Sequence, residues 1–567
     1  MRNIALTIVR RLHVCVFIAV CGTISSLAAA AALRGEPGSV ISTPPDMTYF
    51  AQQGDTLSSI AKKFTDKTPN WKILSKRNHI EDDRAIPVGT PICIPLELLP
   101  EEQSEARIIA LAGTPGLITS NGNEQLLTIG MILKEGAQIR TGKNGFLTLA
   151  LPDESRISIP SNSQLTLSKL RKTKFTSSPR TQLSLSEGKV ESRVSSLASN
   201  KGRFEVSSPL AIAGVRGTHF RVGVSENATA NEVLEGGVAV GMESTAKQAK
   251  DLLLPAGKGN IISASAVGQP VDLLPPPVLD SANVVQTRPT LQFSAQASTN
   301  AAAYRVQIAR DAQAIDILTE SRFKDNRFKF DGLDDGNYYL RATAIDRAGL
   351  EGLPAIQAFT LKARPEPPFT IQPKNKLRSD KVDFVWTESN NAHSYHLQVA
   401  KDHQFQELVL DRNDLKEVQY SSNDIALGDY FWRIATVIEK NGRLDQGPYS
   451  DPQSFAKLPA QAAASFAESE GKEISFNWIG EAGQKFLIQI AKDPEFKTIY
   501  LSKELTEAQL QIPRPDAGQY YIRVKATDPD GYIGKFSATQ KITINARWVS
   551  SDGQALTTSS GVVRTGF

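Results

Sequence analysis

Hydrophobic and polar residues alternate with a period of two along most of the chain, which is typical of half-buried β-strands. From Arg107 to about Val271, short alternating segments are separated by turns rich in glycine and aspartate. This spacing predicts about ten or more short strands and little helix. A chain of 567 residues is too long for one hydrophobic core, so we expect a mainly β protein with several domains.

One pattern occurs three times in the C-terminal half. The segment that starts at Tyr304 recurs at Tyr395 and at Phe486, each 91 residues after the one before. A second shared segment begins at Gly336, Gly428 and Gly518. A repeat of this length with alternating apolar runs predicts one β-sandwich per repeat, and therefore three in tandem.

The core and the outer face of each repeat can be read from the same pattern. Alternation from Phe486 to Ile490 directs one face toward a second sheet and leaves Gln489 outside. One aromatic position per repeat is the expected centre of the core: Phe293, Trp386 and Trp478. The Gly-x-Tyr-aromatic-x-Arg segments and the turns after them resemble fibronectin type III domains. That resemblance implies a sandwich fold and no particular function.

The first compact stretch, near residues 46–99, has a different pattern. Thr48 to Gln52 and Gly89 to Pro95 are predicted strands, and two helices are expected between them. Asp55 or Thr56 caps the first helix, and the second spans Asn70 to Arg77. We expect this small βααβ unit to pack both helices on one face of a two-stranded sheet.

The motif residues of this stretch resemble the LysM domain over its whole length. They are Tyr49, Gly54, Asp55, Thr56, Leu57, Ile60, Ala61, Trp71, Leu74, Asn78, Ile80, Val88, Gly89, Ile92, Ile94 and Pro95. The family binds glycans that contain N-acetylglucosamine, which in bacteria means peptidoglycan, in a shallow groove between two loops. Carried over by position, the groove residues are Gly54, Asp55, Thr56, Leu57, Asn78, His79 and Ile80.

Each polar residue of this groove also has a structural interpretation. Asp55 and Thr56 are good helix caps, and Asn78 tolerates a left-handed turn. His79 is also typical of a solvent-facing loop. Cys93 lies between apolar neighbours, and we expect an inert, packed thiol there.

The β-rich stretch that follows resembles the periplasmic domain of the FecR family. The resemblance is carried by Gly130, Leu133, Gly136, Ile139–Gly142 and Asp153–Ser155, then by Pro209, Gly214–Thr218, Phe220, Val222, Val233 and Glu235–Val240. Glu154 stands where the family commonly has glycine. Well-known members relay a signal through a transmembrane helix to a sigma factor, and this sequence shows neither that helix nor a cytoplasmic segment. What the resemblance implies is the fold and an envelope setting.

The segment Arg216 to His219 contains several residue types that could form a functional site or stabilise a corner between strands. Gly217 indicates a bulge or a close backbone approach. Arg216 could pair with a carboxylate, and Thr218 could satisfy a turn. His219 has no partner at metal-ligand spacing, so we expect no metal there.

The N-terminal residues have the pattern of a targeting segment. Arg2, Arg10 and Arg11 precede an apolar stretch from Val14 to Ile24, and a run of small residues follows. This order predicts a secretory signal peptide over residues 1–32. An uncleaved anchor helix is the alternative, although polar residues interrupt the stretch.

Removal of this signal peptide changes the charge and the cysteine count. The chain has 64 basic and 60 acidic residues, and loss of three signal arginines leaves 61 and 60. A near-neutral chain gives no electrostatic reason to expect nucleic acid as a partner. We expect no membrane insertion after cleavage, because no later segment is sufficiently apolar. Of three cysteines only Cys93 remains, so no disulfide within the chain is expected.

Stretches rich in proline, glycine or charge mark the expected domain limits. They are the spacer Gly35 to Pro45, the acidic run Pro100 to Glu105 and the proline-rich Leu273 to Pro277. We predict a signal peptide at 1–32, a LysM domain at 46–99, a FecR-like domain at 106–272, fibronectin type III-like repeats at 278–362, 367–457 and 462–546, and a flexible tail at 547–567.

No constellation of catalytic residues is visible. The sequence lacks the zinc-protease, serine-hydrolase and P-loop motifs, and no C-x-x-C pair occurs. His393, His396 and His403 could approach one another, but a solvated strand edge is the expected explanation. We expect no catalytic residues, no metal and no cofactor.

Together these observations predict an exported, non-catalytic protein of the periplasm or cell envelope. Its LysM module would bind peptidoglycan and anchor a scaffold that binds a protein or glycan partner. The first alternative is envelope signalling, in which the FecR-like domain senses a partner and relays this to a membrane protein. The second is a cell-wall enzyme without a recognisable motif.

Overall fold

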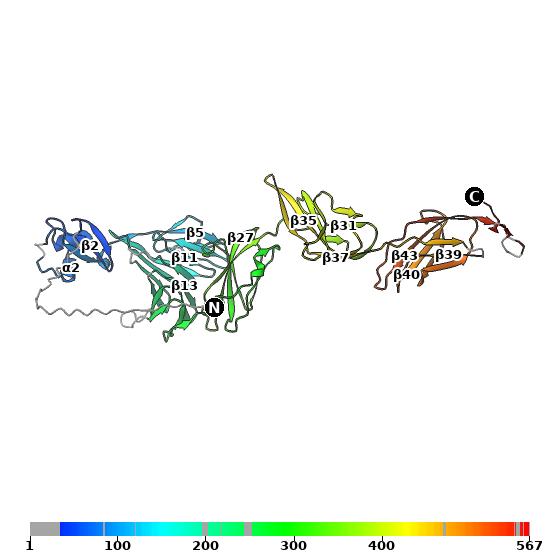
Figure 1. Cartoon of the computed structure of the whole chain (residues 1–567). Helices are drawn as coiled ribbons and strands as arrows, with labels where there is room; N and C mark the ends of the chain where they lie inside the picture. Colours follow the sequence, from blue (N-terminus) through cyan, green and yellow to red (C-terminus); the bar gives the residue numbers. More distant parts are fainter. Residues whose placement is uncertain are drawn as a thin grey trace, which may run out of the picture. The chain divides into compact units, whose positions relative to one another are not determined.

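The computed structural model describes residues 35–82, 86–119, 121–195, 202–215, 217–242, 252–468, 472–548, 550–551, 556–559 and 561–565 (Figure 1). The predicted signal peptide and Arg216 lie outside these residues. Strands dominate, and the α-helices lie near the N-terminal end of the described chain (Figure 1), which confirms the mainly β fold class. None of the helices described is both long enough and apolar enough to cross a membrane.

Contacts divide the described chain into two units. The first comprises the chain up to Pro275 together with Ile315–Glu320 and Ile345–Leu353. The second comprises Pro276–Ala314, Ser321–Ala344 and the chain from Pro354 onward. Two short segments of the first predicted repeat therefore belong to the first unit.

The first unit begins with a small module of helices on a sheet. Its strands form an antiparallel sheet in the order β1 (Val40–Thr43), β2 (Asp46–Phe50), β3 (Pro91–Pro95). Its helices are α1 (Leu57–Thr65) and α2 (Trp71–Asn78), with 3₁₀ turns η1 (Thr68–Asn70) and η2 (Leu96–Leu98). One core joins sheet and helices, through Met47, Tyr49, Leu57, Ile60, Phe64, Leu74, Ile92 and Ile94.

The prediction of a two-stranded sheet was wrong, because the segment expected as a spacer supplies β1. Val40 and Ile41 on this strand are exposed, so β1 is held through its backbone pairing with β2. An edge strand of this kind buries little side-chain surface, and the hydrophobic pattern therefore carries no sign of it. Trp71 packs against the core from a half-buried position.

The rest of the first unit is a continuous network of paired strands. They are β4 (Glu101–Gln103), β5 (Ala106–Ala112), β6 (Gly116–Ile118), β7 (Glu124–Leu126), β8 (Ile132–Leu133), β9 (Gln138–Arg140), β10 (Phe146–Ala150), β11 (Arg156–Ile159), β12 (Gln164–Thr173), β13 (Pro179–Arg193), β14 (Arg203–Ser207), β15 (Ala211–Val215), β16 (His219–Ser225), β17 (Ala228–Glu235), β18 (Gly237–Met242), β19 (Leu252–Pro255), β20 (Lys258–Ser263) and β21 (Val271–Asp272). The expectation of many short strands and little helix is confirmed.

The long strand β13 pairs with two different groups of strands in this network. Its first part pairs with β12 and β14, and its last residues pair with β11 and β16. The acidic run Pro100 to Glu105 was expected as a break between domains, but it contains β4, which pairs with β12. Pairing with a long neighbouring strand outweighs the weak strand preference of these glutamates.

The second unit contains three successive stretches, each with a small and a larger sheet. The first has β22 (Val285–Gln286), β23 (Leu291–Ser294), β24 (Ala303–Ala309), β25 (Ile317–Phe323), β26 (Arg327–Phe330), β27 (Gly336–Ile345) and β28 (Ala355–Leu361), with the 3₁₀ turn η4 (Ser281–Asn283). The second has β29 (Thr370–Gln372), β30 (Asn375–Arg378), β31 (Val382–Trp386), β32 (Ser394–Ala400), β33 (Leu408–Leu415), β34 (Gln419–Ser422), β35 (Gly428–Lys440), β36 (Arg443–Tyr449) and β37 (Gln453–Leu458). The third has β38 (Ser465–Glu468), β39 (Glu473–Asn477), β40 (Lys485–Ala491), β41 (Ile499–Leu505), β42 (Gln509–Pro513), β43 (Gly518–Thr527) and β44 (Gln540–Ile544).

The aromatic positions expected in the cores are buried: Phe293, Trp386 and Trp478. Phe486, Ile488 and Ile490 are buried as well, which confirms the inward face predicted for that strand. In the described residues near the C-terminal end, short strands pair: β45 (Ala546–Arg547) with β48 (Arg564–Thr565) and β46 (Thr557–Thr558) with β47 (Gly561–Val562). These two-residue strands are too short to produce a recognisable alternation in the sequence.

Candidate glycan-binding site

Two loops leave the same end of the N-terminal sheet. β2 ends at Phe50, whose strand partner is Pro91, the first residue of β3. The amide of Ala51 donates to the carbonyl oxygen of Thr90 at 3.0 Å, and the amide of Gly89 donates to the carbonyl oxygen of Ala51 at 2.8 Å. These bonds join the loop after β2 to the loop before β3. The predicted glycan-binding residues lie in these loops or at the adjoining ends of α1 and α2.

Hydrogen bonds fix the polar side chains of the loop between β2 and α1. One carboxylate oxygen of Asp55 accepts from the hydroxyl of Tyr49 and from the amide of Gln52, both at 2.7 Å. Burial and this carboxylate together raise the pKa of the Tyr49 phenol. Thr56 and Ser59 form a reciprocal capping box at the start of α1. These side chains therefore shape the loop.

Gly54 and Leu57 occupy opposite environments in this loop. Gly54 is exposed, has a φ of 85°, and a Cβ atom placed there would meet nothing within 4 Å. The Leu57 side chain is 0% exposed and belongs to the core. Leu57 therefore offers no surface to a glycan, whereas the surface above Gly54 is open.

Asn78 ties the end of α2 to the middle of β3. Its side-chain amide donates to the carbonyl oxygen of Cys93 at 2.8 Å and to that of Leu74 at 2.9 Å. Its side-chain oxygen accepts from the amide of Cys93 at 2.6 Å. Asn78 is helical and not a left-handed turn residue, so the position predicted for a turn falls on the next residue.

His79 and Ile80 continue the chain out of α2. His79 has a left-handed backbone with a φ of 56° and is exposed. The amides of both residues point back to the carbonyl oxygen of Ser75, and the Ser75 hydroxyl donates to the carbonyl oxygen of Ile80 at 2.7 Å. The Ile80 side chain is half-buried against the core. Gly54 and His79 are thus the most exposed of the seven predicted residues.

Comparison with protein families matches two parts of the chain. The LysM domain model matches residues 49–95, and the FecR protein model matches residues 137–239. The chain carries a LysM domain and a FecR domain. LysM domains bind peptidoglycan and related N-acetylglucosamine glycans, and both domains are non-catalytic types found in envelope-associated binding and signalling proteins. No curated protein matches the chain.

Two similarities to solved structures are weak. A candidate anti-sigma factor from Parabacteroides distasonis ATCC 8503 is 20% identical over 24% of this chain, with a TM-score of 0.19. The chain spans 57% of the length of that protein. The FN1–FN3 domains of chicken CNTN1 are 16% identical over 47% of this chain and 98% of theirs, with a TM-score of 0.20. TM-scores this low establish no common overall fold.

The predicted corner of the FecR domain around Gly217 is present. The strand pairing of β16 with β17 shifts between His219 and Phe220, as expected for a bulge. A Cβ atom on Gly236 would lie 2.9 Å from the carbonyl oxygen of Gly217, so the backbone approach there is close. The Thr218 hydroxyl donates to the carbonyl oxygen of Gly237 at 3.0 Å. Residues of this segment therefore serve a strand corner.

The histidines singled out by the sequence contact different partners. The Nε2 atom of buried His219 lies 2.7 Å from a carboxylate oxygen of Glu191. His396 lies 2.5 Å from Asp411, while the ring of His403 contacts Phe431. Within the described ranges, no group of three histidine, cysteine or acidic residues is placed to hold a metal ion.

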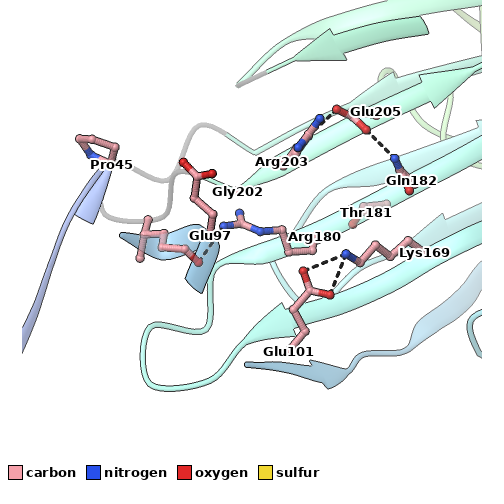
Figure 2. A pocket seen from close by; sticks show the side chains of 11 residues that line it. Pro45, Glu97, Glu101, Lys169, Arg180, Thr181, Gln182, Gly202, Arg203 and Glu205 are labelled. Atoms are coloured by element: carbon pink, nitrogen blue, oxygen red, sulfur yellow. Dashed lines mark hydrogen bonds and ion pairs between the residues drawn. The ribbon is translucent and has the colours of Figure 1, made fainter. Parts of the chain in front are cut away.

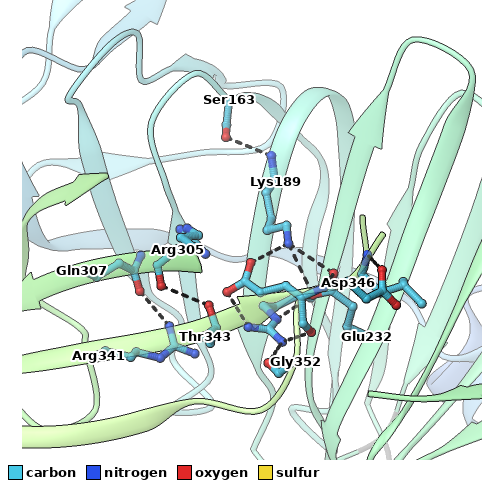
Figure 3. A network of polar contacts seen from close by, with 12 residues as sticks. Ser163, Lys189, Glu232, Arg305, Gln307, Arg341, Thr343, Asp346 and Gly352 are labelled. Carbon is cyan, nitrogen blue, oxygen red and sulfur yellow. Dashed lines mark hydrogen bonds and ion pairs between the residues drawn. The ribbon is translucent and has the colours of Figure 1, made fainter. Parts of the chain in front are cut away.

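The first unit contains a buried ionic network that the sequence does not predict (Figure 3). The guanidinium of Arg221 contacts Glu232 and Glu351, each at 2.7 Å, and donates to the carbonyl oxygens of Glu351 and Gly352 at 2.7 Å. The Lys189 ammonium lies 2.7 Å from Glu351 and 3.3 Å from Glu232. Arg221 and both carboxylates are almost completely buried.

This network was missed because the alternation in β16 predicts an outward Arg221. Phe220 and Val222 face the core, but Arg221 is equally buried because Ile345–Leu353 covers its side of the strand. A buried charge requires paired, hydrogen-bonded partners, and Glu351 of this segment is one of them. No local pattern near residue 221 indicates a partner 130 residues away.

Proposed function

We propose that the protein is an exported, non-catalytic component of the bacterial envelope that binds peptidoglycan through its LysM domain. The observation that carries this proposal is the match of the LysM model to residues 49–95. The hydrogen bonds that join the two groove loops support it, because a shallow binding groove needs both loops in fixed positions. Residues 1–32 would direct export.

The groove would use backbone groups of Gly54 to Thr56 and of Asn78 to Ile80. N-acetyl groups offer one donor and one acceptor each, which backbone groups can match. Gly54 leaves room for a sugar ring, and the exposed His79 lies at the other loop. The side chains of Asp55, Thr56 and Asn78 would contribute by holding the loops in shape.

The three sandwiches would form a fibronectin type III-like scaffold that, with the FecR domain, binds a protein or glycan partner. One cross-strand pair recurs in them at 2.7–3.0 Å: Arg341 with Gln307, Arg433 with Gln398 and Arg523 with Gln489. A shared pair at equivalent positions supports three copies of one fold. The proposed limits of the modules are those predicted from the sequence.

The FecR match favours a second candidate function, envelope signalling. In this case the FecR domain would sense a partner, bind a membrane protein and relay the signal to it. Crosslinking from residues 106–272 tests this candidate. Recovery of a membrane protein would support signalling, whereas recovery of peptidoglycan alone would count against it.

Retention on purified peptidoglycan sacculi tests the main proposal. Gly54→Asn fills the open space above the groove, and asparagine tolerates the left-handed backbone at this position. We expect the mature protein to be retained and the Gly54→Asn variant to be lost in the wash. Gly122→Asn is the matched control, since Gly122 also has a left-handed backbone and open space but lies in the FecR domain.

Equal retention of the wild-type and Gly54→Asn proteins would contradict the proposed groove. Failure of the wild-type protein to bind sacculi would contradict the function itself. Release of soluble muropeptides during the incubation would show that the protein is a wall enzyme.

A further inference from the structure

A row of arginines crosses the sheet of the FecR domain on its outer face. The strand register places Arg107 on β5, Arg156 on β11 and Arg193 on β13 in one line, with β10 between the first two. Residues directly opposite one another in a sheet point to the same face. Ile108 and Ile157, each one residue away from an arginine of the row, are buried in the core. The three arginines therefore point away from the core.

None of these arginines has a carboxylate partner in the described part of the chain. Arg156 donates to the carbonyl oxygens of Glu154 and Ser155 at 2.9 and 3.2 Å, and the side chains of Arg107 and Arg193 have no hydrogen bond or ion pair there. Arg107 is exposed, and the other two are half-buried. Each guanidinium carries five N–H donors, so most donors of this row have no protein acceptor among the described residues.

The placement of these charges is unfavourable for the sheet. Arg156 and Arg193 are direct register partners, and like charges opposite one another destabilise a sheet. Glu191 lies two residues before Arg193 on the same face, but it contacts His219 at 2.7 Å. An unfavourable local arrangement that its neighbours do not offset is typical of a binding site.

Other cations of the FecR domain have carboxylate partners. In the polar pocket shown in Figure 2, Lys169 lies 2.7 Å from Glu101, and Arg203 contacts Glu205. These charges satisfy one another and leave no excess charge for a ligand. The arginine row differs from them because no described carboxylate offsets its charge.

The same face already binds an acidic segment of this chain. Arg221 on β16 lies one row further along this face than Arg193 and contacts Glu351 at 2.7 Å. Lys189 on β13 contacts the same carboxylate at 2.7 Å. Glu351 belongs to Ile345–Leu353, which covers this part of the face. The arginine row continues the surface into a part that is less covered, since Arg221 is fully buried and Arg193 is half-buried.

The size and chemistry of the row favour one kind of ligand. From β5 to β13 the row spans three strand intervals, or about 14 Å. A small anion would contact one or two guanidinium groups, whereas an extended peptide of about five residues reaches all three. Carboxylates suit the guanidinium fork, which binds them through two parallel hydrogen bonds. A neutral glycan would leave these charges without partners.

We propose that the row of Arg107, Arg156 and Arg193 docks an acidic polypeptide segment of a partner protein, which lies across β5, β10, β11 and β13. The carboxylates of this segment bind the arginines as Glu351 binds Arg221. The inference rests on the proposed function, because that function gives the FecR domain a partner. It does not require glycan binding by the LysM domain, so the two can fail separately.

Fluorescence anisotropy with the mature full-length protein tests the proposal. The probe is a labelled peptide of eight glutamates with blocked ends, and polyphosphate and oligogalacturonate are the competitors. We expect Arg156→Gln/Arg193→Gln to weaken binding of the peptide at least tenfold. Lys134→Gln/Arg140→Gln is the matched control, since it removes the same charge from two FecR cations that already face carboxylates. This control should change the affinity less than twofold.

Thermal unfolding separates a role in binding from a role in folding. Removal of two opposed charges relieves repulsion, so Arg156→Gln/Arg193→Gln should melt at the wild-type temperature or above it. A lower melting temperature would show that these arginines stabilise the sheet and would overturn the inference.

Three binding results would also overturn the inference. They are unchanged peptide binding in Arg156→Gln/Arg193→Gln, an equal loss in the control variant, and tighter binding of polyphosphate or oligogalacturonate than of the peptide. The last result would indicate a phosphate polymer or an acidic glycan as the ligand.

Retention on sacculi distinguishes this inference from the peptidoglycan-binding function. Wild-type protein that is retained on sacculi but does not bind the glutamate peptide would refute the arginine row and leave peptidoglycan binding standing. Peptide binding that depends on Arg156 and Arg193, without retention on sacculi, would support the row and refute the LysM groove.

Discussion

In the LysM domain, single side chains form hydrogen bonds with backbone groups that no neighbouring strand pairs with. Asn78 presents a donor and an acceptor to the backbone of Cys93, as a neighbouring strand would. A buried backbone group that loses its hydrogen-bond partner lowers the free energy of unfolding. The proposed glycan-binding loop thus depends on a side chain whose residue type also suits a sugar contact.

We predict that Asn78→Ala lowers the stability of the LysM domain by about 1–3 kcal/mol, since it removes bonds to half-buried backbone groups. Hydrogen exchange of the Cys93 amide should accelerate, because its acceptor is lost. The exposed Asn123 provides the control, and Asn123→Ala should leave this exchange rate unchanged. Unchanged exchange in both variants would contradict the role of Asn78.

A second prediction concerns pH and Glu135 of the FecR domain. Its hydrogen bonds to Arg171, at 2.7 and 2.8 Å, lower the pKa of this carboxyl from 4.5 to about 2. Because the pKa is lower in the folded state, the ion pair stabilises the domain above pH 4.5, and this contribution is lost as the pH falls toward 2. Wild-type protein should therefore melt at a higher temperature than Glu135→Gln at pH 6.

The difference in melting temperature should shrink at pH 2, where about half of the folded molecules carry a protonated Glu135. Other carboxyl groups titrate in the same range, so only the difference between the two proteins reports on Glu135. Calorimetry of both proteins at both pH values provides the measurement. A difference that stays constant would show that Glu135 does not stabilise the domain.

Among the structural elements, strand β16 shows how a distant segment changes a local pattern. Its residues alternate as in a strand with one exposed face, yet both faces are buried because Ile345–Leu353 covers the second. Arg221 is consequently buried among Glu232, Glu351 and Lys189. The FecR domain and this segment should therefore unfold together.

We expect Glu351→Ala to destabilise the first unit by about 3–5 kcal/mol, because it leaves the buried Arg221 without one of its carboxylates. Calorimetric unfolding of the full chain gives the measurement. Glu226→Ala, at an exposed turn of the FecR domain, is the control and should change the stability little. A loss below about 1 kcal/mol would mean that the network adds little to folding.

At the scale of the whole molecule, ion pairs join the second and third of the successive β-rich stretches of the second unit. Asp528 at the end of β43 lies 2.6 Å from Lys376 and 3.1 Å from Arg378, both on β30. Arg378 also binds Glu481 through two bonds, at 2.6 and 2.8 Å. These residues are far apart in sequence, so the ion pairs connect separate cores.

A double-mutant cycle of Arg378→Ala and Asp528→Ala should give a coupling of about 1–3 kcal/mol for unfolding of the second unit. The exposed pair Lys381 and Asp383, at 3.2 Å, is the comparison and should couple by about 0–1 kcal/mol. Equal coupling for the two pairs would show that the connection between the sandwiches is no stronger than a surface ion pair.

Much of this protein could be predicted from local patterns. Period-two alternation identified the strands around Phe486, and the 91-residue spacing predicted three tandem sandwiches. The spacing of Gly54, Asp55 and Thr56 before an apolar helix located the LysM domain. Such features depend on neighbours close in sequence, and a pattern can therefore reveal them.

Other features followed only from the tertiary structure. β1 pairs through its backbone, and its sequence carries no signal. The core position of Leu57 and the burial of Arg221 each depend on segments brought together by folding. The sequence alone determined most of the strands, both helices and the families they resemble. The tertiary structure decided which side chains stay exposed to bind, because exposure depends on what the rest of the chain covers.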